Sequence, residues 1–356
     1  MKLIKNFLKI IFLVIIIVII IFCSIILINT IYDYNPAQEI VLINENTNIA
    51  NKADTCEFSI ISWNIGYCGL GSEMDFFYEG GDNVKPSKEL YNKYLNGISK
   101  CLSNYSFNDF ILLQECDICS KRTYKTDQFK YFSSTLSDFW GFNAINYDVK
   151  FIPFPLTNPM GRVKSGIANF SKFKPYSVVR YSLPGSYSWP KNIFFLDRCI
   201  LISKFNINNK NLVIINLHNS AFDDADYIRE NEMNYIKNIM ISEYKKGNYV
   251  IAAGDWNINP YGFSEQKINK NFAVKTVTST LTNNFFDEGW QWVYDNKIPS
   301  NRDVNSKYEP NKTLTTILDF FVVSPNIKIF EVKNYDLGFE FADHHPVKLK
   351  FGFNKE

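Results

Sequence analysis

Apolar residues form one long segment near the N-terminus and a series of short runs along the rest of the chain. The long segment, residues 10–28, consists almost entirely of Ile, Leu, Val and Phe. As an α-helix it would extend roughly 28 Å at a rise of about 1.5 Å per residue, which is close to the hydrocarbon thickness of a bilayer. The pattern therefore predicts an N-terminal transmembrane helix.

The short apolar runs predict β-strands, because they are rich in β-branched and aromatic side chains and have the length of strands. Several are continuously apolar rather than alternating, as expected for strands that are covered on both faces. The predicted strands span residues 58–63, 110–113, 166–170, 199–203, 212–217, 249–253, 317–323 and 347–351.

Two other segments have the periodicity or the end signals of helices. Residues 87–105 follow Pro86, a favoured first helical residue, and carry an apolar residue at every fourth position. Residues 224–246 begin with acidic residues and end in Lys245-Lys246-Gly247, which suits the helix macrodipole and the C-cap. Strands separated by such helices predict a layered α/β domain.

Charges beside the apolar segment predict its topology. Lys2, Lys5 and Lys9 precede it and no comparable basic cluster follows, so the N-terminus is expected in the cytoplasm and the rest outside. The predicted organisation is a basic tail (1–9), a single-pass signal anchor of the cell membrane (10–28), a polar stalk (29–55) and an extracellular domain (56–356). A cleaved signal peptide is the rival interpretation, but its apolar region is usually shorter and ends at small residues.

The amino-acid composition excludes few classes of function. The 38 basic and 36 acidic residues nearly balance, which disfavours a protein that grips nucleic acid by global charge alone. Seven cysteines include a lone C-x-x-C, Cys116 and Cys119, and a structural zinc site would need a second pair. Buried thiols and an incidental disulfide both remain open.

Polar side chains repeatedly stand at one end of a predicted strand, directly after it or directly before it. All three histidines do so: His218 closes one strand, and His344 and His345 come just before another. Glu115 and Asp255 follow two further strands in the same way. Enzymes of the α/β class build their sites at such a sheet edge, so these residues predict an active site.

The motifs that contain these residues resemble a known family. Together they resemble the endonuclease/exonuclease/phosphatase superfamily, the deoxyribonuclease I-like metal-dependent phosphoesterases, over about residues 58–353. The resemblance implies a four-layer sandwich of two mixed β-sheets flanked by helices, preceded here by the transmembrane helix. The motifs, in the family's order, are Ser62-Trp63-Asn64, Leu113-Gln114-Glu115, Asn216-Leu217-His218, Gly254-Asp255-Trp256-Asn257, Leu318-Asp319-Phe320 and Asp343-His344-His345-Pro346.

The resemblance also implies a metal site. Phosphodiester hydrolysis benefits from a divalent cation that offsets the charge on the phosphate oxygens. Glu115 matches the metal-binding glutamate, and Asn64 and Asp343 match positions close to the metal. Oxygen ligands of this kind favour Mg²⁺ or Mn²⁺. Without the resemblance, a solvated Glu115 and an Asn64 that merely forms a turn would be the ordinary interpretations.

Catalytic roles follow from the same motifs. Asp255 and Asn257 alternate along a strand and so project to one side, and they match the family's pair that orients water and contacts the phosphate. Asp319 lies in an apolar strand and needs a partner, which His344 supplies as an acid–imidazole pair. His345 occupies the family's variable position and is expected to flank the site.

Other candidates are less specific. His218 matches a second imidazole that contacts the scissile phosphate, and Asn219 offers an uncharged donor beside it. Arg198 is a candidate phosphate clamp, with an ion pair to Asp197 as the alternative. Two departures from the family pattern are Ala342, in place of the usual Ser, and Trp256, in place of Phe; the latter is expected in the core.

The predicted function is a membrane-anchored phosphodiesterase that hydrolyses a phosphoester by in-line attack of water. The substrate is a nucleic acid or a phospholipid headgroup of the sphingomyelin or phosphoinositide type, with a slight preference for nucleic acid, and the sequence indicates no protein partner. A nuclease would use basic loop residues, for which the candidates are Lys121, Arg122, Arg162, Lys164, Lys172 and Lys174. A lipid hydrolase would use an apolar hairpin, for which 147–156 is the candidate. A non-catalytic binding module is disfavoured because every chemically required position is occupied.

Overall fold

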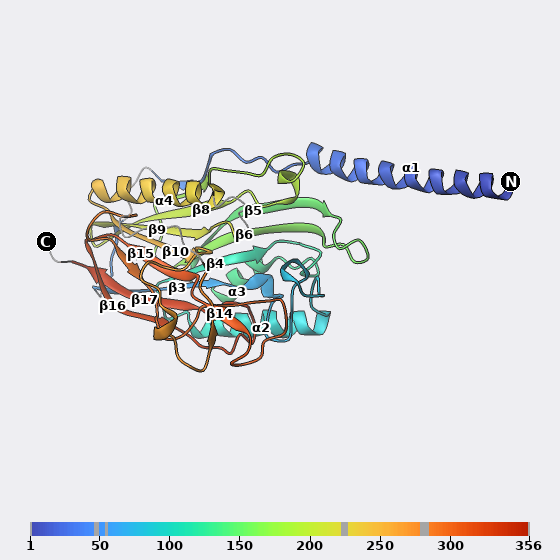
Figure 1. Ribbon diagram of the computed structural model, residues 1–356. Coiled ribbons are helices and arrows are strands. Elements are labelled where there is room, and N and C mark those ends of the chain that lie inside the picture. Colours follow the sequence, from blue (N-terminus) through green and yellow to red (C-terminus); the bar gives the residue numbers. More distant parts are fainter. Residues whose placement is uncertain (1, 46–49, 54–55, 222–226, 278–284, 355–356) are drawn as a thin grey trace.

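Two β-sheets pack face to face in the computed structural model, which describes residues 2–45, 50–53, 56–221, 227–277 and 285–354 (Figure 1). The first sheet has the strand order β1 (Glu39–Asn44), β7 (Ser177–Ser182), β8 (Cys199–Ile207), β9 (Lys210–His218), β10 (Tyr249–Asp255), β15 (Asp319–Val323) and β12 (Gln291–Val293), with β2 (Ala50–Asn51) paired to β8. The second has the order β16 (Ile327–Asn334), β17 (Val347–Phe353), β3 (Glu57–Asn64), β4 (Phe110–Asp117), β6 (Gly161–Ser171) and β5 (Trp140–Ile152). A small third sheet contains β11 (Ala273–Val274), β14 (Leu314–Thr316) and β13 (Asn301–Arg302).

Helices cover the outer faces of the two large sheets. Helix α4 (Tyr227–Lys245) lies over the first sheet, and α2 (Lys88–Asn104) and α3 (Gln128–Thr135) lie over the second (Figure 1). Both sheets are mixed: in the first, β9–β10 and β2–β8 are parallel pairs, in the second β3–β4 is parallel, and the other pairs are antiparallel. The expected four-layer α/β sandwich is confirmed.

The centre of the domain is the apolar layer between the sheets. Phe58 and Phe110 from the second sheet meet Phe205, Ile251 and Phe321 from the first, and all five are almost fully buried. These residues come from the continuous apolar runs of the sequence. Burial of both faces explains why those runs do not alternate.

The predicted strands are present, and so are both predicted helices, although residues 224–226 of the second lie outside the described residues; the segment predicted as a polar stalk is partly folded. Strand β1 pairs antiparallel with β7, and β2 pairs with β8, so residues 29–55 contribute two edge strands to the first sheet. The stalk prediction was wrong here because β1 has only a short apolar run, Ile40–Ile43, within an otherwise polar, Asn-rich segment, and this run is exposed along most of its length.

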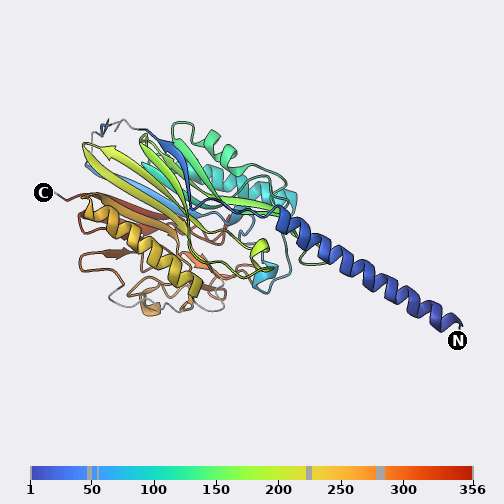
Figure 2. The same ribbon diagram turned by 90° about the horizontal axis from the view of Figure 1, so that it is seen from above.

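The N-terminal helix α1 (Lys2–Ile31) is longer than the predicted span and is the one helix among the described residues that is long and apolar enough to cross a membrane. It extends away from the domain in both views (Figures 1 and 2). Its last turn is bound to the domain: the buried side-chain amide of Asn29 donates to the Phe151 carbonyl (2.9 Å) and accepts from the Phe151 N–H (3.2 Å). Trp189 donates from Nε1 to Thr30 Oγ1 (3.1 Å).

The cysteines are all free thiols, with Cys68, Cys116 and Cys199 buried in the domain. The lone C-x-x-C therefore forms no disulfide. Cys116 is a small buried side chain, as one interpretation of these residues held, whereas Cys119 is exposed.

Trp256 lies in the apolar layer between the first sheet and α4. Its ring stacks on that of Phe320 (5.0 Å between centroids, 6° between planes), and its Nε1 donates to the Phe320 carbonyl (3.0 Å). The side chain is fully buried, as expected for a residue that packs the core.

We expect Trp256→Ala to lower the free energy of unfolding by about 3–5 kcal/mol, because it leaves a large cavity in a close-packed layer. Trp256→Phe keeps the stack and loses one hydrogen bond, so it should cost only about 1 kcal/mol. Urea unfolding of the full chain in detergent micelles measures both. Equal losses for the two variants would contradict the packing role.

Asp197 stands where the chain after α1 meets the domain. Burial raises the pKa of Asp197 to about 7, and the carboxylates of Asp33 and Asp148 add to this while Arg180 opposes it. The folded protein therefore holds a proton on Asp197 at a pH where the unfolded chain, with a pKa of about 3.9, has released it.

Stability should consequently fall as pH rises from about 4 to about 7 through the titration of Asp197. Asp197→Asn removes this penalty. Unfolding curves should show the variant to be more stable than the wild type at pH 8 and indistinguishable from it near pH 4. The same difference at both pH values would refute the assignment to this carboxyl group.

Candidate active site

Strand register brings three predicted site residues into one row. Asp255, at the end of β10, is directly opposite His218 at the end of parallel β9 and opposite Asp319 at the start of antiparallel β15. In the facing sheet, Asn64 ends β3 beside Gln114 of β4. The two sheet edges lie against each other, so the polar ends of five strands line one region.

His344 and Asp319 form the predicted acid–imidazole pair. His344 Nδ1 lies 2.7 Å from Asp319 Oδ2, and both side chains are buried. Burial by itself lowers the pKa of His344, but the carboxylates of Asp319, Asp255 and Asp343 outweigh it and raise the pKa well above its ordinary value. The imidazole therefore carries a proton on Nδ1, held by Asp319, and presents Nε2 to the site.

Asp255 is the centre of the polar cluster. Its Oδ2 accepts from Asn64 Nδ2 (3.0 Å) and lies 3.5 Å from His218 Nε2 and 3.7 Å from His344 Nε2. Its Oδ1 accepts from the main-chain N–H of Asn257 (3.0 Å). Burial raises the pKa of Asp255 to about 6, with His344 lowering it and Asp319 raising it.

Glu115 reaches the cluster through an irregularity in β4. The β4–β6 register shifts between Leu113 and Cys116, and Glu115 has a left-handed backbone (φ 57°). This conformation is unfavourable for a residue with a Cβ, and bulges of this kind redirect a side chain near functional sites. Glu115 Oε1 accepts from Asn64 Nδ2 (3.2 Å) and lies 4.0 Å from His218 Nε2.

Asp343 faces the same space from the loop before β17. Its Oδ2 is 3.9 Å from His344 Nε2, and its buried Oδ1 has no hydrogen-bond partner among the described residues. Burial raises the pKa of Asp343 to about 7. A side chain at position 66 would collide with this carboxylate, since a Cβ on Gly66 would lie 2.4 Å from Oδ1.

These residues fit a divalent cation. The buried carboxylates of Asp255 and Asp343 and the partly exposed carboxylate of Glu115 (26% exposed) lie around the same space, and desolvation raises the pKa of each. Such groups need a positive charge nearby, and the unpartnered Asp343 Oδ1 is a hard oxygen donor of the type that Mg²⁺ and Mn²⁺ prefer. Asp255, Asp319 and His344 also lie close enough together to be metal ligands, but hydrogen bonds within the cluster already use Asp319 Oδ2 and His344 Nδ1.

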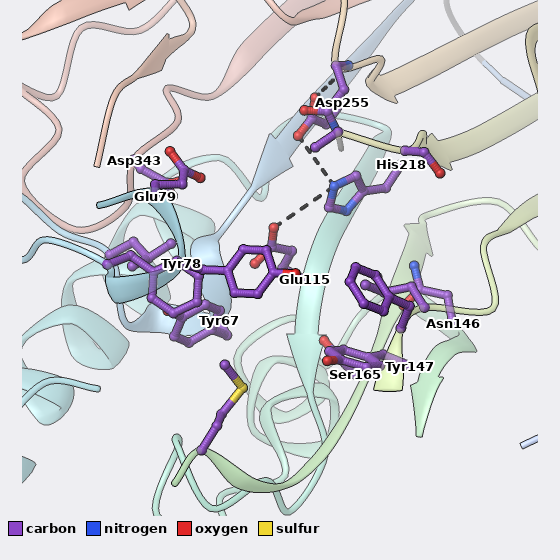
Figure 3. Close-up of a pocket in the computed structure, with 18 of the residues that line it drawn as sticks. Tyr67, Tyr78, Glu79, Glu115, Asn146, Tyr147, Ser165, His218, Asp255 and Asp343 are labelled. Atoms are coloured by element: carbon purple, nitrogen blue, oxygen red, sulfur yellow. Dashed lines mark hydrogen bonds and ion pairs between the residues drawn. The ribbon is translucent and has the colours of Figure 1, made fainter. Parts of the chain in front are cut away.

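His218 is neutral. Burial first, and then the charges of Arg198 and His344, lower the pKa of His218 well below its ordinary value. Its Nε2 faces Asp255 and Glu115, as Figure 3 shows. Arg198 lines the same cavity and donates from Nη1 to the His218 carbonyl (3.1 Å).

The side chain of Asn219 does not face the substrate cavity, although the sequence predicts it there as a donor beside His218. Its side chain is fully buried and its Nδ2 points to Met233 Sδ (3.0 Å) beneath α4. The prediction of substrate contact was wrong because successive side chains at a strand end face opposite sides, and His218 takes the cavity side. The Asn219 carbonyl instead accepts from Asn257 Nδ2 (2.7 Å) and so orients that residue.

Asn301 belongs to the site although the sequence did not indicate it. It lies on the short strand β13, its Nδ2 atom is 3.0 Å from His344 Nε2, and it lines the cavity. The strand is only two residues long and is held by pairing with β14 and His344. No periodicity marks so short an element, and so only the tertiary structure reveals Asn301.

The polar cluster forms one end of a cavity of about 630 Å³. The rest of the cavity is largely aromatic and apolar, and Tyr67, Tyr78 and Tyr147 are seen around it in Figure 3. The loop at 76–79, which is rich in aromatic residues, contributes to this lining. Further apolar lining residues are Phe76, Phe77, Ile152, Pro153, Phe154, Met160, Phe194 and Phe195.

Most of the basic residues that a nuclease was expected to use are engaged elsewhere. Arg122 is buried against Asp117 (2.8 Å) and stacks over the ring of Tyr67. Arg162 pairs with Asp148, and Lys174 pairs with Glu45. Lys121 and Lys172 donate to the carbonyls of Pro159 and Phe107. Of these side chains only Arg122 lines the cavity, and it does so while paired with Asp117.

Comparisons with known proteins identify the fold. No family model matches the chain, and no curated protein matches it. Among solved structures, similar ones are an endonuclease/exonuclease/phosphatase from Beutenbergia cavernae DSM 12333 (13% identity, TM-score 0.56, covering 84% of this chain and 72% of that one) and one from Bacteroides vulgatus (12%, 0.53, 84% and 100%). D. rerio TDP2 complexed with single strand DNA product is also similar (14%, 0.52, 84% and 100%). The chain thus has the fold of the endonuclease/exonuclease/phosphatase superfamily, as its motifs predict.

Proposed function

We propose that the protein is a divalent-metal-dependent phosphodiesterase. The observation that carries the proposal is the meeting of a buried Asp319–His344 pair with the carboxylates of Glu115, Asp255 and Asp343 at one end of a cavity. The similar structures support it, because one holds a single strand DNA product and others are endonuclease/exonuclease/phosphatase proteins by name. A binding module without activity would not need three carboxylates, two of them buried, to be held around one space.

The roles of the residues follow from their positions. Glu115, Asn64 and Asp343 would hold the Mg²⁺ or Mn²⁺. A bound cation would offset the negative charge that builds up on the phosphate oxygens. Asp255 aligns the attacking water and accepts its proton. Asn257 donates a hydrogen bond to the phosphate.

Two imidazoles complete the reaction in this proposal. His344, charged because of Asp319, donates from Nε2 to a phosphate oxygen or to the leaving oxygen. His218 is neutral and donates a hydrogen bond from one ring nitrogen without adding charge. Arg198, at the cavity wall, offers a charged donor to a phosphate oxygen. Asn219 acts only through the orientation of Asn257.

We also propose that α1 is a single-pass anchor of the cell membrane, with residues 1–9 in the cytoplasm, 10–28 in the bilayer and the catalytic domain outside. The length and apolar character of the helix and the three preceding lysines support this topology. The domain then begins with β1 rather than at residue 56, since β1 is part of the first sheet.

Replacement of His344 by Ala should lower the turnover of bis-p-nitrophenyl phosphate by about 10²–10⁴-fold, because a positioned acid or base is lost. His345→Gln is the matched control, since His345 is the adjacent buried histidine and stacks on Phe339 instead of facing the site. Its activity per folded molecule should match the wild type. Circular dichroism confirms that each variant folds, and full activity of His344→Ala would refute the role.

Removal of divalent metal with EDTA should abolish turnover, and added Mg²⁺ or Mn²⁺ should restore it. Glu115→Gln keeps the shape of the side chain but removes its charge, so it should raise the Mg²⁺ concentration for half-maximal activity by about 10-fold or more. Titration of activity against free Mg²⁺ measures this. Undiminished activity in EDTA, after dialysis, would contradict the proposed metal dependence.

A further inference from the structure

The apolar part of the cavity opens beside the end of α1. Phe154 both lines the cavity and is 54% exposed, so it stands at the mouth. It belongs to the loop that joins β5 to β6, and β5 carries Phe151, whose main chain is hydrogen-bonded to Asn29 of α1. The mouth is therefore only a few residues from the point where the membrane helix joins the domain.

Exposed apolar side chains surround this mouth. Leu156, in the β5–β6 loop, is 78% exposed, and Trp189, which is hydrogen-bonded to Thr30, is 62% exposed. With Phe151 and Phe154 they are called the apolar rim: Phe151 and Trp189 are hydrogen-bonded to the last turn of α1, and Phe154 and Leu156 follow Phe151 in the β5–β6 loop. Isolated exposed apolar residues are ordinary, but several held near one helix end beside a cavity indicate an interaction surface.

The position of the rim fixes the depth at which it meets the bilayer. If residues 10–28 fill the hydrocarbon layer, Asn29 and Thr30 lie at its surface, because each helical residue advances only about 1.5 Å. Their hydrogen bonds then hold Phe151 and Trp189 at that same surface. A tryptophan with a bonded N–H and an exposed ring is typical of the region between lipid tails and water.

The apolar rim lies on the side of the domain from which α1 extends. In both views α1 runs away from the end of the domain where β5 and β6 are joined (Figures 1 and 2). Trp140, at the other end of the 13-residue strand β5, is then roughly 40 Å from the bilayer side at about 3.3 Å per residue. One end of β5, at Ile152, would then lie near the bilayer, and the other end, at Trp140, would lie far from it.

We propose that the apolar rim rests in the headgroup layer of the membrane that holds α1, and that the cavity receives the phosphodiester of a lipid from that layer. The inference rests on the proposed phosphodiesterase function and names its substrate class. Water adds to the phosphorus, one P–O bond breaks, and the products are an alcohol and a phosphomonoester. The aromatic lining accommodates the apolar portion of the lipid while the phosphate reaches His344 and Asp255.

The positions of charged side chains also favour a lipid over a nucleic acid. A long polyanion needs an extended basic surface, but Arg162 and Lys174 are paired with acids outside the cavity. The basic residues that line the cavity are partly engaged, since Arg122 and Lys275 are paired with Asp117 and Asp303 and Lys191 lies over the Tyr187 ring. A lipid needs an apolar path from the bilayer to the polar cluster. The cavity provides such a path, from Phe154 at the mouth to Tyr147 and Tyr67 farther in.

The contact with the bilayer is tested by tryptophan quenching. The full chain is reconstituted in phosphatidylcholine vesicles that contain lipids brominated close to the headgroup, which quench only nearby tryptophans. The quenched fraction should drop in Trp189→Phe and persist in Trp140→Phe, a matched control with an exposed ring at the far end of β5. Quenching that is the same in Trp189→Phe as in the wild type overturns the proposal.

The substrate is tested in the same vesicles, prepared separately with phosphatidylcholine, phosphatidylglycerol or sphingomyelin, with bis-p-nitrophenyl phosphate as the soluble substrate. Release of headgroup products is expected from at least one lipid. Leu156→Ser should lower lipid turnover by about tenfold or more, since one exposed Leu loses its burial in the bilayer. Its turnover of bis-p-nitrophenyl phosphate should stay within about twofold, because Leu156 lines neither the cavity nor the polar cluster.

Phe107→Ser is the matched control for this variant, because Phe107 is similarly exposed (61%) and lies outside the rim and the cavity. It should change neither activity, and an equal loss of lipid turnover in Phe107→Ser overturns the proposal. Hydrolysis of single-stranded DNA or RNA without hydrolysis of any of the three lipids would also overturn the lipid proposal. The phosphodiesterase function would still stand in that case. If bis-p-nitrophenyl phosphate is not hydrolysed either, the phosphodiesterase function itself fails.

Discussion

The candidate site depends on the register of β9, β10 and β15, which places His218, Asp255 and Asp319 in one row at the sheet edge. A shift by one residue would turn each side chain to the opposite face, into the apolar layers that cover the sheet. The register is held by those layers, because the residues between the strand ends are buried on both sides. The same burial that stabilises the domain therefore sets the positions of its polar groups.

Concentrating carboxylates at a buried edge is costly for stability. Burial raises the pKa of Asp255 and Asp343 toward neutrality, and Glu115 has an unfavourable backbone conformation. Folded proteins retain such strain where function requires it. A bound cation would relieve the repulsion between these groups, so metal binding and stability are expected to be coupled at this site.

The connection between α1 and the domain is also specific. The Asn29 amide pairs with both main-chain groups of Phe151, and β1 joins the first sheet immediately afterwards. A flexible stalk would let the domain rotate freely above the bilayer. The observed connection instead gives the cavity mouth a fixed orientation relative to α1, and this orientation is the basis for assigning a lipid substrate.

Much of the fold was accessible from sequence because apolar runs identify central strands directly. Of the strands that were missed, β1, β5 and β16 are edge strands paired on one side, and β7, although it lies between β1 and β8, has its short apolar run interrupted by Arg180. The others are only two or three residues long. Asn301 was missed because β13 has no periodicity. Asn219 was placed wrongly because the side to which a strand-end residue points depends on what packs there.

The sequence by itself determined which residues are polar at strand ends, which segment is apolar enough to span a membrane, and which motif order resembles a known fold. These properties are local, since side-chain polarity and spacing can be read within a few residues. Only the tertiary structure decided which charges meet. Residues such as Arg122 and Asp117, or Asn29 and Phe151, become partners through chain turns and packing, and their pairing determines both the shape of the cavity and the direction in which it opens.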